Sequence, residues 1–221
     1  MKRIKIHDLG RISYLEALKI QENLVGEVID GSDTAHMLLL EHFPPVITLG
    51  RRAKSEHLLL DRARLEKKGF QLFESSRGGD VTYHGPGQLI AYPVVRLDGK
   101  NSVRKHMRNL EQSVIDLLGD MDIEGMRKEG FPGVWTSKGK ISSVGVAVKK
   151  WVTYHGLSLN VEPDTGGFDT IIPCGLKEIS VTSLSAMAGR NVTAGEILPR
   201  LAEHLREALG FSSDKAEFVS P

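Results

Sequence analysis

The chain has 221 residues, of which 40% are hydrophobic and 26% are charged. This composition is typical of a globular protein with a hydrophobic core, and the length predicts a single domain over residues 1–221. Lys and Arg together number 29 and Asp and Glu number 28, so the net charge is only +1. Nucleic-acid-binding proteins usually carry a strong basic excess, so this balance argues against a nucleic acid as the partner.

The single cysteine, Cys174, excludes an intramolecular disulfide bond and a four-cysteine zinc site. The first residues lack the apolar stretch of a secretion signal, and no segment approaches the ~18 uninterrupted apolar residues of a membrane span. We therefore expect a soluble cytoplasmic protein that acts without a membrane.

Charge is distributed unevenly along the sequence. Residues 51–150 contain 19 basic and 12 acidic side chains, whereas the segments on either side have an acidic excess. Two interpretations stay open. The basic side chains form an ordinary solvated surface, which is the usual meaning of a charge run, or they form a docking surface for an acidic partner.

Hydrophobic periodicity predicts a mixture of strands and helices. In chain order these are a strand at 3–7, a helix at 14–30, strands at 36–40 and 46–49, a helix at 57–68, strands at 70–74 and 88–95, a helix at 103–118, strands at 141–148 and 154–161, and a helix at 194–209. Ser13 with Glu16, and Thr193 with Glu196, have the spacing of capping boxes at helix starts. The elements do not alternate in a regular strand–helix–strand rhythm, which favours an α+β fold over a doubly wound sheet.

The segment from Arg77 to Gln88, RGGDVTYHGPGQ, does not look like ordinary scaffold. Its glycines allow a backbone to approach a ligand closely and to present N–H groups to it. It lacks the Gly-Lys-Ser/Thr of a P-loop and the GxGxxG spacing of a dinucleotide-binding turn. A long hairpin loop would explain Gly-Pro-Gly equally well.

Cys174 and Lys140 each lie beside glycine in a loop-like stretch, IPCGL and SKGKISSVG. A lone cysteine is usually a small buried hydrophobic residue, and a lysine beside glycine usually marks a solvated turn. A reactive thiol needs partial exposure and a neighbouring cation, and a lysine in a cleft loses solvation, which favours its neutral form and makes it a candidate base. Neither residue is convincing on its own.

Taken together and in this order, RGGDVTYHGPGQL, GKISSVG, YHGLSLNV and PCGL resemble the lipoyl(octanoyl) transferase family over residues 4–210. The resemblance implies a catalytic domain related to biotin- and lipoate-protein ligases, with a mixed sheet and surrounding helices. It implies transfer of an octanoyl group from octanoyl-acyl carrier protein to a lysine of a lipoyl domain. The implied acceptors are the lipoyl domains of 2-oxoacid dehydrogenase E2 subunits and the glycine cleavage H protein, and no cofactor or metal is implied.

The same resemblance implies a role for individual positions. Cys174 matches the family's acyl-thioester nucleophile, and Lys140 matches the lysine that activates it. The implied substrate-binding residues are Arg77, Gly78, Gly79, Asp80, Val81, Thr82, Tyr83, His84, Ser143, Val144, Gly145, Gly156, Leu157 and Ser158.

The chemistry of these residue types agrees with that assignment. A thiolate exchanges readily with a thioester without ATP, and the resulting acyl-enzyme can acylate an amine in a second half-reaction. Three alternatives remain: an amidotransferase that moves octanoyl between lipoyl domains, an ATP-dependent lipoate- or biotin-type ligase, and a non-catalytic acyl-binding module. The ligase chemistry needs no cysteine and a decayed site would not retain both Cys174 and Lys140, so these residues argue against the last two.

Overall fold

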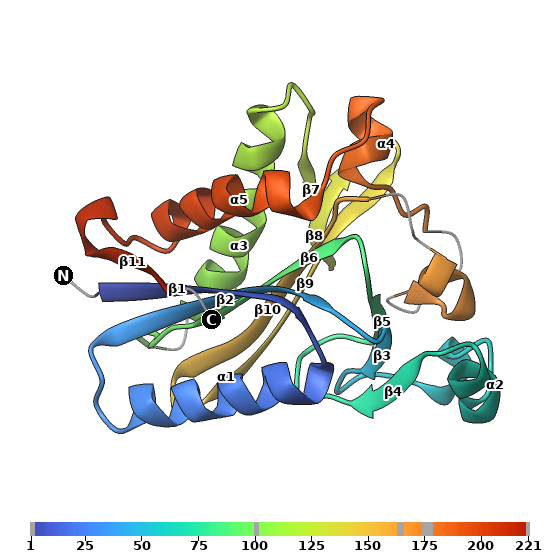
Figure 1. Ribbon diagram of the computed structural model, residues 1–221, viewed down its shortest axis with the longest axis horizontal. Helices are drawn as coiled ribbons and strands as arrows, with labels where there is room; N and C mark the ends of the chain where they lie inside the picture. The colour runs from blue at the N-terminus through green and yellow to red at the C-terminus, as the bar shows by residue number, and fades with distance from the viewer. Residues whose placement is uncertain (1–2, 100–101, 163–165, 174–178, 220–221) are drawn as a thin grey trace.

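A computed structural model of the protein describes residues 3–99, 102–162, 166–173 and 179–219. An eight-stranded sheet in the order β11-β1-β2-β6-β10-β9-β8-β7 runs through it (Figure 1). Its strands are β1 (Arg3–Ile12), β2 (Thr34–His42), β6 (Gln88–Val94), β7 (Met126–Lys128), β8 (Phe131–Thr136), β9 (Gly139–Lys149), β10 (Val152–Asn160) and β11 (Ala216–Val219). β1 pairs in parallel with both β2 and β11, and the other pairs are antiparallel.

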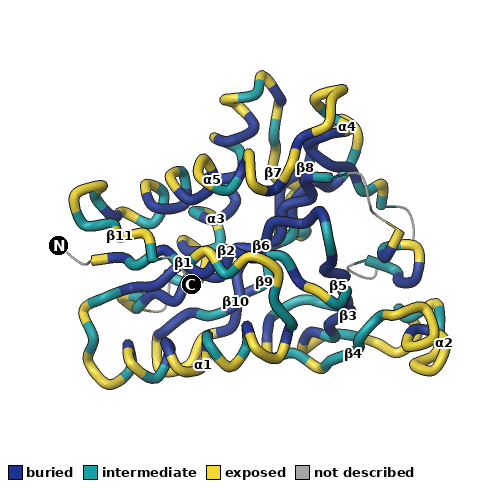
Figure 2. Tube along the Cα trace, viewed as in Figure 1, coloured by how far each residue is buried: buried dark blue, intermediate teal, exposed yellow. Residues whose placement is uncertain are grey.

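Helices cover both faces of this sheet (Figure 1). On one face lie α3 (Ser102–Gly119) and α5 (Ala194–Ala208), whose apolar residues join those of the strands in the largest hydrophobic cluster. On the other face lies α1 (Tyr14–Ile29), which packs on a second cluster. Figure 2 shows the central strands buried and the outer side of α1 exposed, as expected for amphipathic helices around a sheet.

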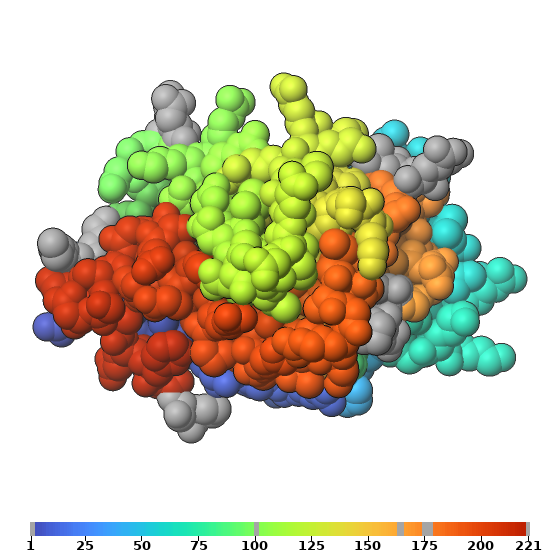
Figure 3. Space-filling model, turned by 90° about the horizontal axis from the view of Figure 1, so that it is seen from above, coloured from blue at the N-terminus to red at the C-terminus, as the bar shows by residue number. Residues whose placement is uncertain are grey.

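The helices α3 and α5 lie side by side, and Figure 3 shows their segments together covering the upper face. The ring nitrogen Nε2 of His204 on α5 lies 2.8 Å from the Asp120 carboxylate, just after α3. This contact adds a polar link at the edge of the apolar helix–helix interface.

A small second sheet, β4-β3-β5, lies at one end of the molecule (Figure 1). It consists of β3 (Val46–Leu49), β4 (Gln71–Glu74) and β5 (Val81–His84), and it packs with α2 (Arg62–Lys67) around a third apolar cluster. The described residues also form α4 (Leu184–Ala188) and short 3₁₀ helices at Ser55–His57, Gly166–Thr170 and Ser213–Lys215. The middle of the glycine-rich segment forms β5 of the small sheet and its last residue, Gln88, begins β6, so the segment connects the small sheet to the large one.

Most of the elements that the sequence predicts are confirmed. The capping box at Ser13 is complete, because the Ser13 hydroxyl accepts from the Glu16 N–H and the Glu16 carboxylate accepts from the Ser13 N–H. At α5 only half of the second box forms: Thr193 accepts from the Glu196 N–H, whereas the Glu196 carboxylate pairs with Arg190.

The predicted helix at 57–68 is wrong in its first half. Residues 58–60 are not helical: Leu58 is extended and forms a β-bridge with Ile171, and the Leu59 N–H donates to the Thr170 carbonyl at 3.0 Å. The helix begins only after Asp61, whose side chain caps it. The leucines that gave the segment its helical periodicity therefore lie in a stretch that pairs with residues 170–171, far away in the sequence. None of the helices in the described ranges is long and apolar enough to cross a membrane.

Candidate active site

A cavity of about 910 Å³ opens between the small sheet, β9, β10 and the start of α3. Of the site residues inferred from the sequence, those that line it are Arg77, Gly78, Gly79, Asp80, Val81, Thr82, His84, Lys140, Ser143, Val144, Gly145, Gly156, Leu157 and Ser158. Three segments that are far apart in the sequence thus meet around one space of a size that suits a small ligand.

Two of the inferred residues are not among those that line the cavity. Tyr83 alternates with Thr82 and His84 on β5 and faces the other way, where its ring packs edge-on against Phe70 and Phe168. Cys174 lies outside the described residues.

The glycine-rich segment is held tightly against β9. The Arg77 guanidinium donates to the Thr48 carbonyl at 2.7 Å and to the Thr48 hydroxyl at 2.9 Å, and the Gly78 N–H donates to the Val146 carbonyl at 2.9 Å. A Cβ on Gly145 would lie 3.0 Å from the Gly78 carbonyl oxygen, so glycine at position 145 allows this close approach. A buried arginine therefore organises the loop.

A bulge in β9 determines where Lys140 lies. Val134 pairs with Ser142 and the next residue, Trp135, pairs with Lys140, so Ile141 is an extra residue in the ladder. The extra residue shifts the alternation of side chains by one position, which puts Lys140 on the same face as Ser143 and Gly145. Ile141 instead joins the hydrophobic core.

Lys140 is only 5% exposed, and its backbone is fixed on both sides. Its N–H donates to the Ser180 carbonyl at 2.8 Å, and its carbonyl accepts from the Thr182 N–H at 3.0 Å. Its ammonium nitrogen lies 5.4 Å from the centre of the Trp135 ring, within the range of a cation–π interaction. The segment that follows residues 174–178 is thus hydrogen-bonded directly to Lys140.

The segment that precedes residues 174–178 is anchored through His57. The His57 carbonyl accepts from the Ile172 N–H at 2.8 Å, and the His57 ring nitrogen Nδ1 lies 2.7 Å from the Asp80 carboxylate. His57 therefore joins the glycine-rich loop to the residues just before Pro173. The sequence does not single out His57, because this residue begins a leucine-rich stretch with helical periodicity.

Buried histidines lie at the cavity and beside it: His84 and His155 line the cavity, and the His42 ring lies next to that of His84. The Nε2 of His42 lies 2.9 Å from the Tyr92 hydroxyl, and the Nδ1 of His84 lies 3.1 Å from the Gln88 side-chain oxygen. His155 has a positive φ of 55°, which costs free energy for a residue with a side chain, and its N–H donates to the Gln21 side chain at 2.8 Å. The family resemblance implies a substrate-binding role for His84, and periodicity places His155 in a strand, but neither assigns anything to His42.

Burial disfavours the charged form of these rings. It lowers the pKa of His42 to about 4, and burial together with the nearby Arg77 charge lowers the pKa of His155 to about 3. Burial also lowers the pKa of His84 well below its ordinary value. At neutral pH these histidine rings are therefore uncharged, and the positive charge near them is that of Arg77.

The lowered pKa values predict a loss of stability in mild acid. Between about pH 6.5 and pH 4 the unfolded chain binds protons at positions where the folded chain does not, so the free energy of unfolding falls as the pH falls. Each such histidine contributes up to ~1.4 kcal/mol per pH unit. Urea unfolding of His42→Asn should therefore show a flatter pH dependence than the unsubstituted protein, with His204→Asn as the control. Identical slopes for His42→Asn and the unsubstituted protein would contradict the assignment.

Comparisons with known proteins agree with this fold and cavity. Residues 13–206 match the family model of the lipoyl protein ligase A/B catalytic domain. A bi-partite lipoate protein ligase from Thermoplasma acidophilum, solved in a study that includes its E2 lipoyl domain, superposes with a TM-score of 0.80 at 15% identity, covering 99% of this chain and 88% of that one. A biotin protein ligase from Aquifex aeolicus superposes with a TM-score of 0.53 at 16% identity, covering 95% and 69%. These two likenesses show the fold.

Sequence similarity shows which family with this fold the chain belongs to. An octanoyltransferase from Solibacter usitatus (strain Ellin6076) is 45% identical over 212 residues, which are 96% of this chain and 95% of that protein. The chain belongs to the octanoyltransferase family within the lipoyl protein ligase A/B catalytic domains. It is an acyltransferase, and both the α+β fold and the resemblance inferred from its motifs are confirmed.

Proposed function

We propose that the protein transfers octanoyl from octanoyl-acyl carrier protein to a specific lysine of lipoyl domains, through a thioester on Cys174 and with the help of Lys140. The observation that carries this proposal is the placement of Lys140. It lies buried in the cavity wall, and its backbone is hydrogen-bonded to residues 180 and 182, shortly after Cys174 in the sequence. The acceptors are the lipoyl domains of 2-oxoacid dehydrogenase E2 subunits and the glycine cleavage H protein.

The first half-reaction loads the enzyme. The Cys174 thiolate attacks the octanoyl carbonyl carbon, the bond from that carbon to the carrier sulfur breaks, and the carrier leaves as a thiol after taking up a proton. One thioester replaces another, so the step is nearly isoenergetic and needs no ATP. In its cationic form Lys140 favours the thiolate.

The second half-reaction transfers the octanoyl group from Cys174 to the acceptor lysine. The amine of the acceptor lysine attacks the thioester carbonyl, a C–N bond forms, and the bond to the Cys174 sulfur breaks. The amine proton passes to a base, for which the neutral form of Lys140 is the candidate. Formation of an amide from a thioester makes this step downhill, and the two half-reactions predict ping-pong kinetics.

The apolar part of the cavity suits the octanoyl chain. Val103 and Met107 of α3 face the same space as Val144 and Leu157. Burying the methylene groups of the chain contributes about 0.8 kcal/mol each. The chain would therefore provide much of the binding energy, while the polar groups near Lys140 orient the reacting carbonyl.

The first prediction for this function concerns the nucleophile. Incubation with octanoyl-acyl carrier protein in the absence of ATP should add one octanoyl mass to the intact protein, and hydroxylamine should remove it, because thioesters are sensitive to that reagent. Cys174→Ala should gain no mass, since the chain has one cysteine. An acylated Cys174→Ala protein would exclude the covalent mechanism. Loading from an octanoylated lipoyl domain, but not from the carrier, would favour the amidotransferase instead.

The second prediction concerns Lys140. Lys140→Ala should slow alkylation of the thiol near neutral pH, by ~10-fold for each unit by which the thiol pKa rises when the cation is lost. Lys140→Arg should keep the charge but fail in transfer to the amine, because Arg does not give up its proton. An unchanged alkylation profile in Lys140→Ala would rule out Lys140 as the partner of the thiolate.

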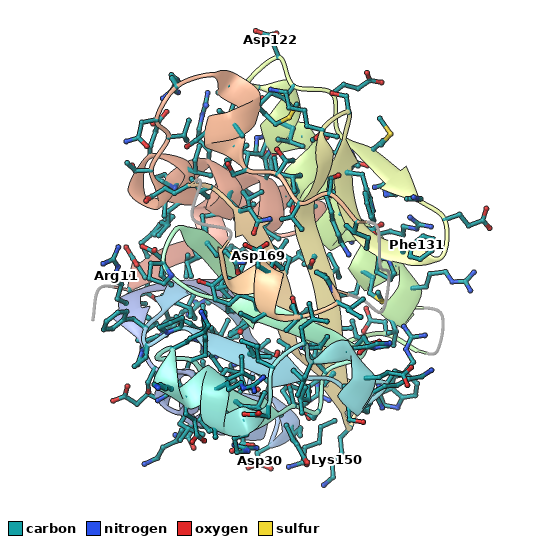
Figure 4. All side chains as sticks on the ribbon, turned by 90° about the vertical axis from the view of Figure 1, so that its right-hand side faces the viewer. Arg11, Asp30, Asp122, Phe131, Lys150 and Asp169 are labelled. Carbon is teal, nitrogen blue, oxygen red and sulfur yellow. The ribbon has the colours of Figure 1, made fainter. Side chains whose placement is uncertain are left out.

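The basic surface suggested by the sequence divides into separate groups. Arg51, Arg52 and Lys54 line the cavity, and the N–H groups of Arg51 and Arg52 donate to the Arg77 and Gly79 carbonyls at 3.1 and 3.0 Å. Lys149 and Lys150 lie at the β9–β10 hairpin, and Figure 4 shows Lys150 well away from Phe131, a residue of the cavity wall. The cavity group is the one that supports docking of an acidic carrier.

The third prediction tests this docking. Reversing the charge of Arg51 and Arg52 should lower the on-rate of octanoyl-acyl carrier protein and weaken its salt dependence, while reactivity toward octanoyl-pantetheine stays intact. The matched control reverses Lys149 and Lys150, which changes the net charge equally but away from the cavity. An equal loss with both donors would indicate damage to the site, and an equal effect of the two charge reversals would refute docking at Arg51 and Arg52.

A further inference from the structure

Glu111 of α3 is a buried carboxylate that the proposed mechanism does not use. Its side chain is only 5% exposed, and it is not among the residues that line the cavity. One carboxylate oxygen accepts from the Gly133 N–H at 3.0 Å. The other accepts from Arg108 at 2.9 Å and from Arg127 at 3.1 Å.

Gly133 connects the Glu111 carboxylate to Lys140, because it is bonded to the carboxylate and lies against the lysine side chain. The residue lies on β8 opposite Ser143, directly before the place where the pairing with β9 becomes irregular. Its φ of +123° is rarely adopted by residues with a side chain. A Cβ built on it would lie 2.9 Å from the Lys140 Cε and 2.2 Å from the Ser142 carbonyl oxygen. The bare backbone of Gly133 is thus one wall of the space that the Lys140 side chain occupies.

We propose that Glu111 is a positioning residue for Lys140. By holding the Gly133 N–H, its carboxylate fixes the β8 backbone against the bulge in β9, and this contact directs the lysine side chain into the cavity. The two arginines fix the carboxylate in turn. The inference rests on the proposed role of Lys140 as partner of the thiolate.

Two observations favour this role over a purely structural ion pair. Arg108 and Arg127 occupy one oxygen only, and the second oxygen is used for a backbone group that contacts the Lys140 side chain. Pairing between β8 and β7 is also irregular around Gly133, because Phe131 pairs with Lys128 but Trp135 pairs with Met126, and the Glu111 carboxylate supplies the acceptor for the Gly133 N–H there. A purely structural ion pair would need neither the bond to Gly133 nor its position beside Lys140.

The experiment compares substitutions that separate the hold on Gly133 from the charge. Glu111→Leu removes both, Glu111→Gln keeps an oxygen that can accept from Gly133, and Glu111→Asp keeps the charge but withdraws the carboxylate by one methylene group. The control is Glu41→Leu, because the Glu41 carboxylate likewise accepts from a glycine N–H, that of Gly87, and pairs with Arg11. The readout is the pH profile of Cys174 alkylation, with thermal unfolding measured in parallel.

We expect Glu111→Leu and Glu111→Asp to slow alkylation near neutral pH, toward the profile of Lys140→Ala. Glu111→Gln should keep the profile of the unsubstituted protein. In the Lys140→Ala background, Glu111→Leu should slow alkylation no further, because the group that it positions is already gone. The Glu41→Leu substitution should leave the profile unchanged in both backgrounds.

The inference is overturned if folded Glu111→Leu or Glu111→Asp keeps the unsubstituted profile while Lys140→Ala shifts it. It is also overturned if Glu111→Gln behaves like Glu111→Leu, since charge alone would then be responsible, or if the Glu111 and Lys140 substitutions slow alkylation additively. Should Glu111→Leu not fold, the contrast between Glu111→Asp and Glu111→Gln decides. A profile that Lys140→Ala itself leaves unchanged would instead refute the proposed function.

Discussion

A one-residue bulge in β9 is the feature on which the rest of the cavity depends. Side chains alternate strictly along a strand, so a single inserted residue moves every earlier side chain to the opposite face. Without Ile141 as the extra residue, Lys140 would lie on the same face as Val134, which packs in the hydrophobic core. A buried ammonium group among aliphatic side chains would cost several kcal/mol. With the bulge, the amine reaches a polar cavity and an aromatic ring, and Ile141 fills the core instead.

The bulge needs support from outside its own sheet. Regular antiparallel pairing satisfies backbone groups by itself, but an irregular stretch leaves some of them to find other partners. Here the Lys140 backbone pairs with residues 180 and 182, and the Gly133 N–H pairs with the Glu111 side chain. The helix α3 and the chain just after residue 178 therefore both contribute to holding one short region of β8 and β9. Each contact brings a distant part of the sequence to the lysine.

The sequence predicted the helices and strands of the fold better than it predicted the long-range contacts around Lys140. Periodicity identified α1, α3 and α5, and capping residues marked the starts of α1 and α5, because apolar faces and N-terminal caps are local features. The motifs also brought the glycine-rich loop, Lys140 and the two strand segments to one cavity. Periodicity failed at residues 58–60, where a long-range pairing with Ile171 overrides helical spacing. Tyr83 shows a similar limit, since a motif does not say which alternate residues of a strand face the ligand.

The residues missed by the sequence analysis share a physical reason. Glu111 looks like a charged position on an amphipathic helix, and only the packing of α3 on β8 shows that its carboxylate is buried. His57 is recognised only through its distances to Asp80 and Ile172. Such roles arise from contacts between segments that lie far apart along the chain, and one sequence contains no record of those contacts. The fold shared with a lipoate protein ligase makes the same point, because a TM-score of 0.80 accompanies only 15% identity. In the proposed mechanism two side chains, Cys174 and Lys140, carry out thioester exchange on a fold shared with lipoate protein ligases, because chemistry depends on the site rather than on the fold.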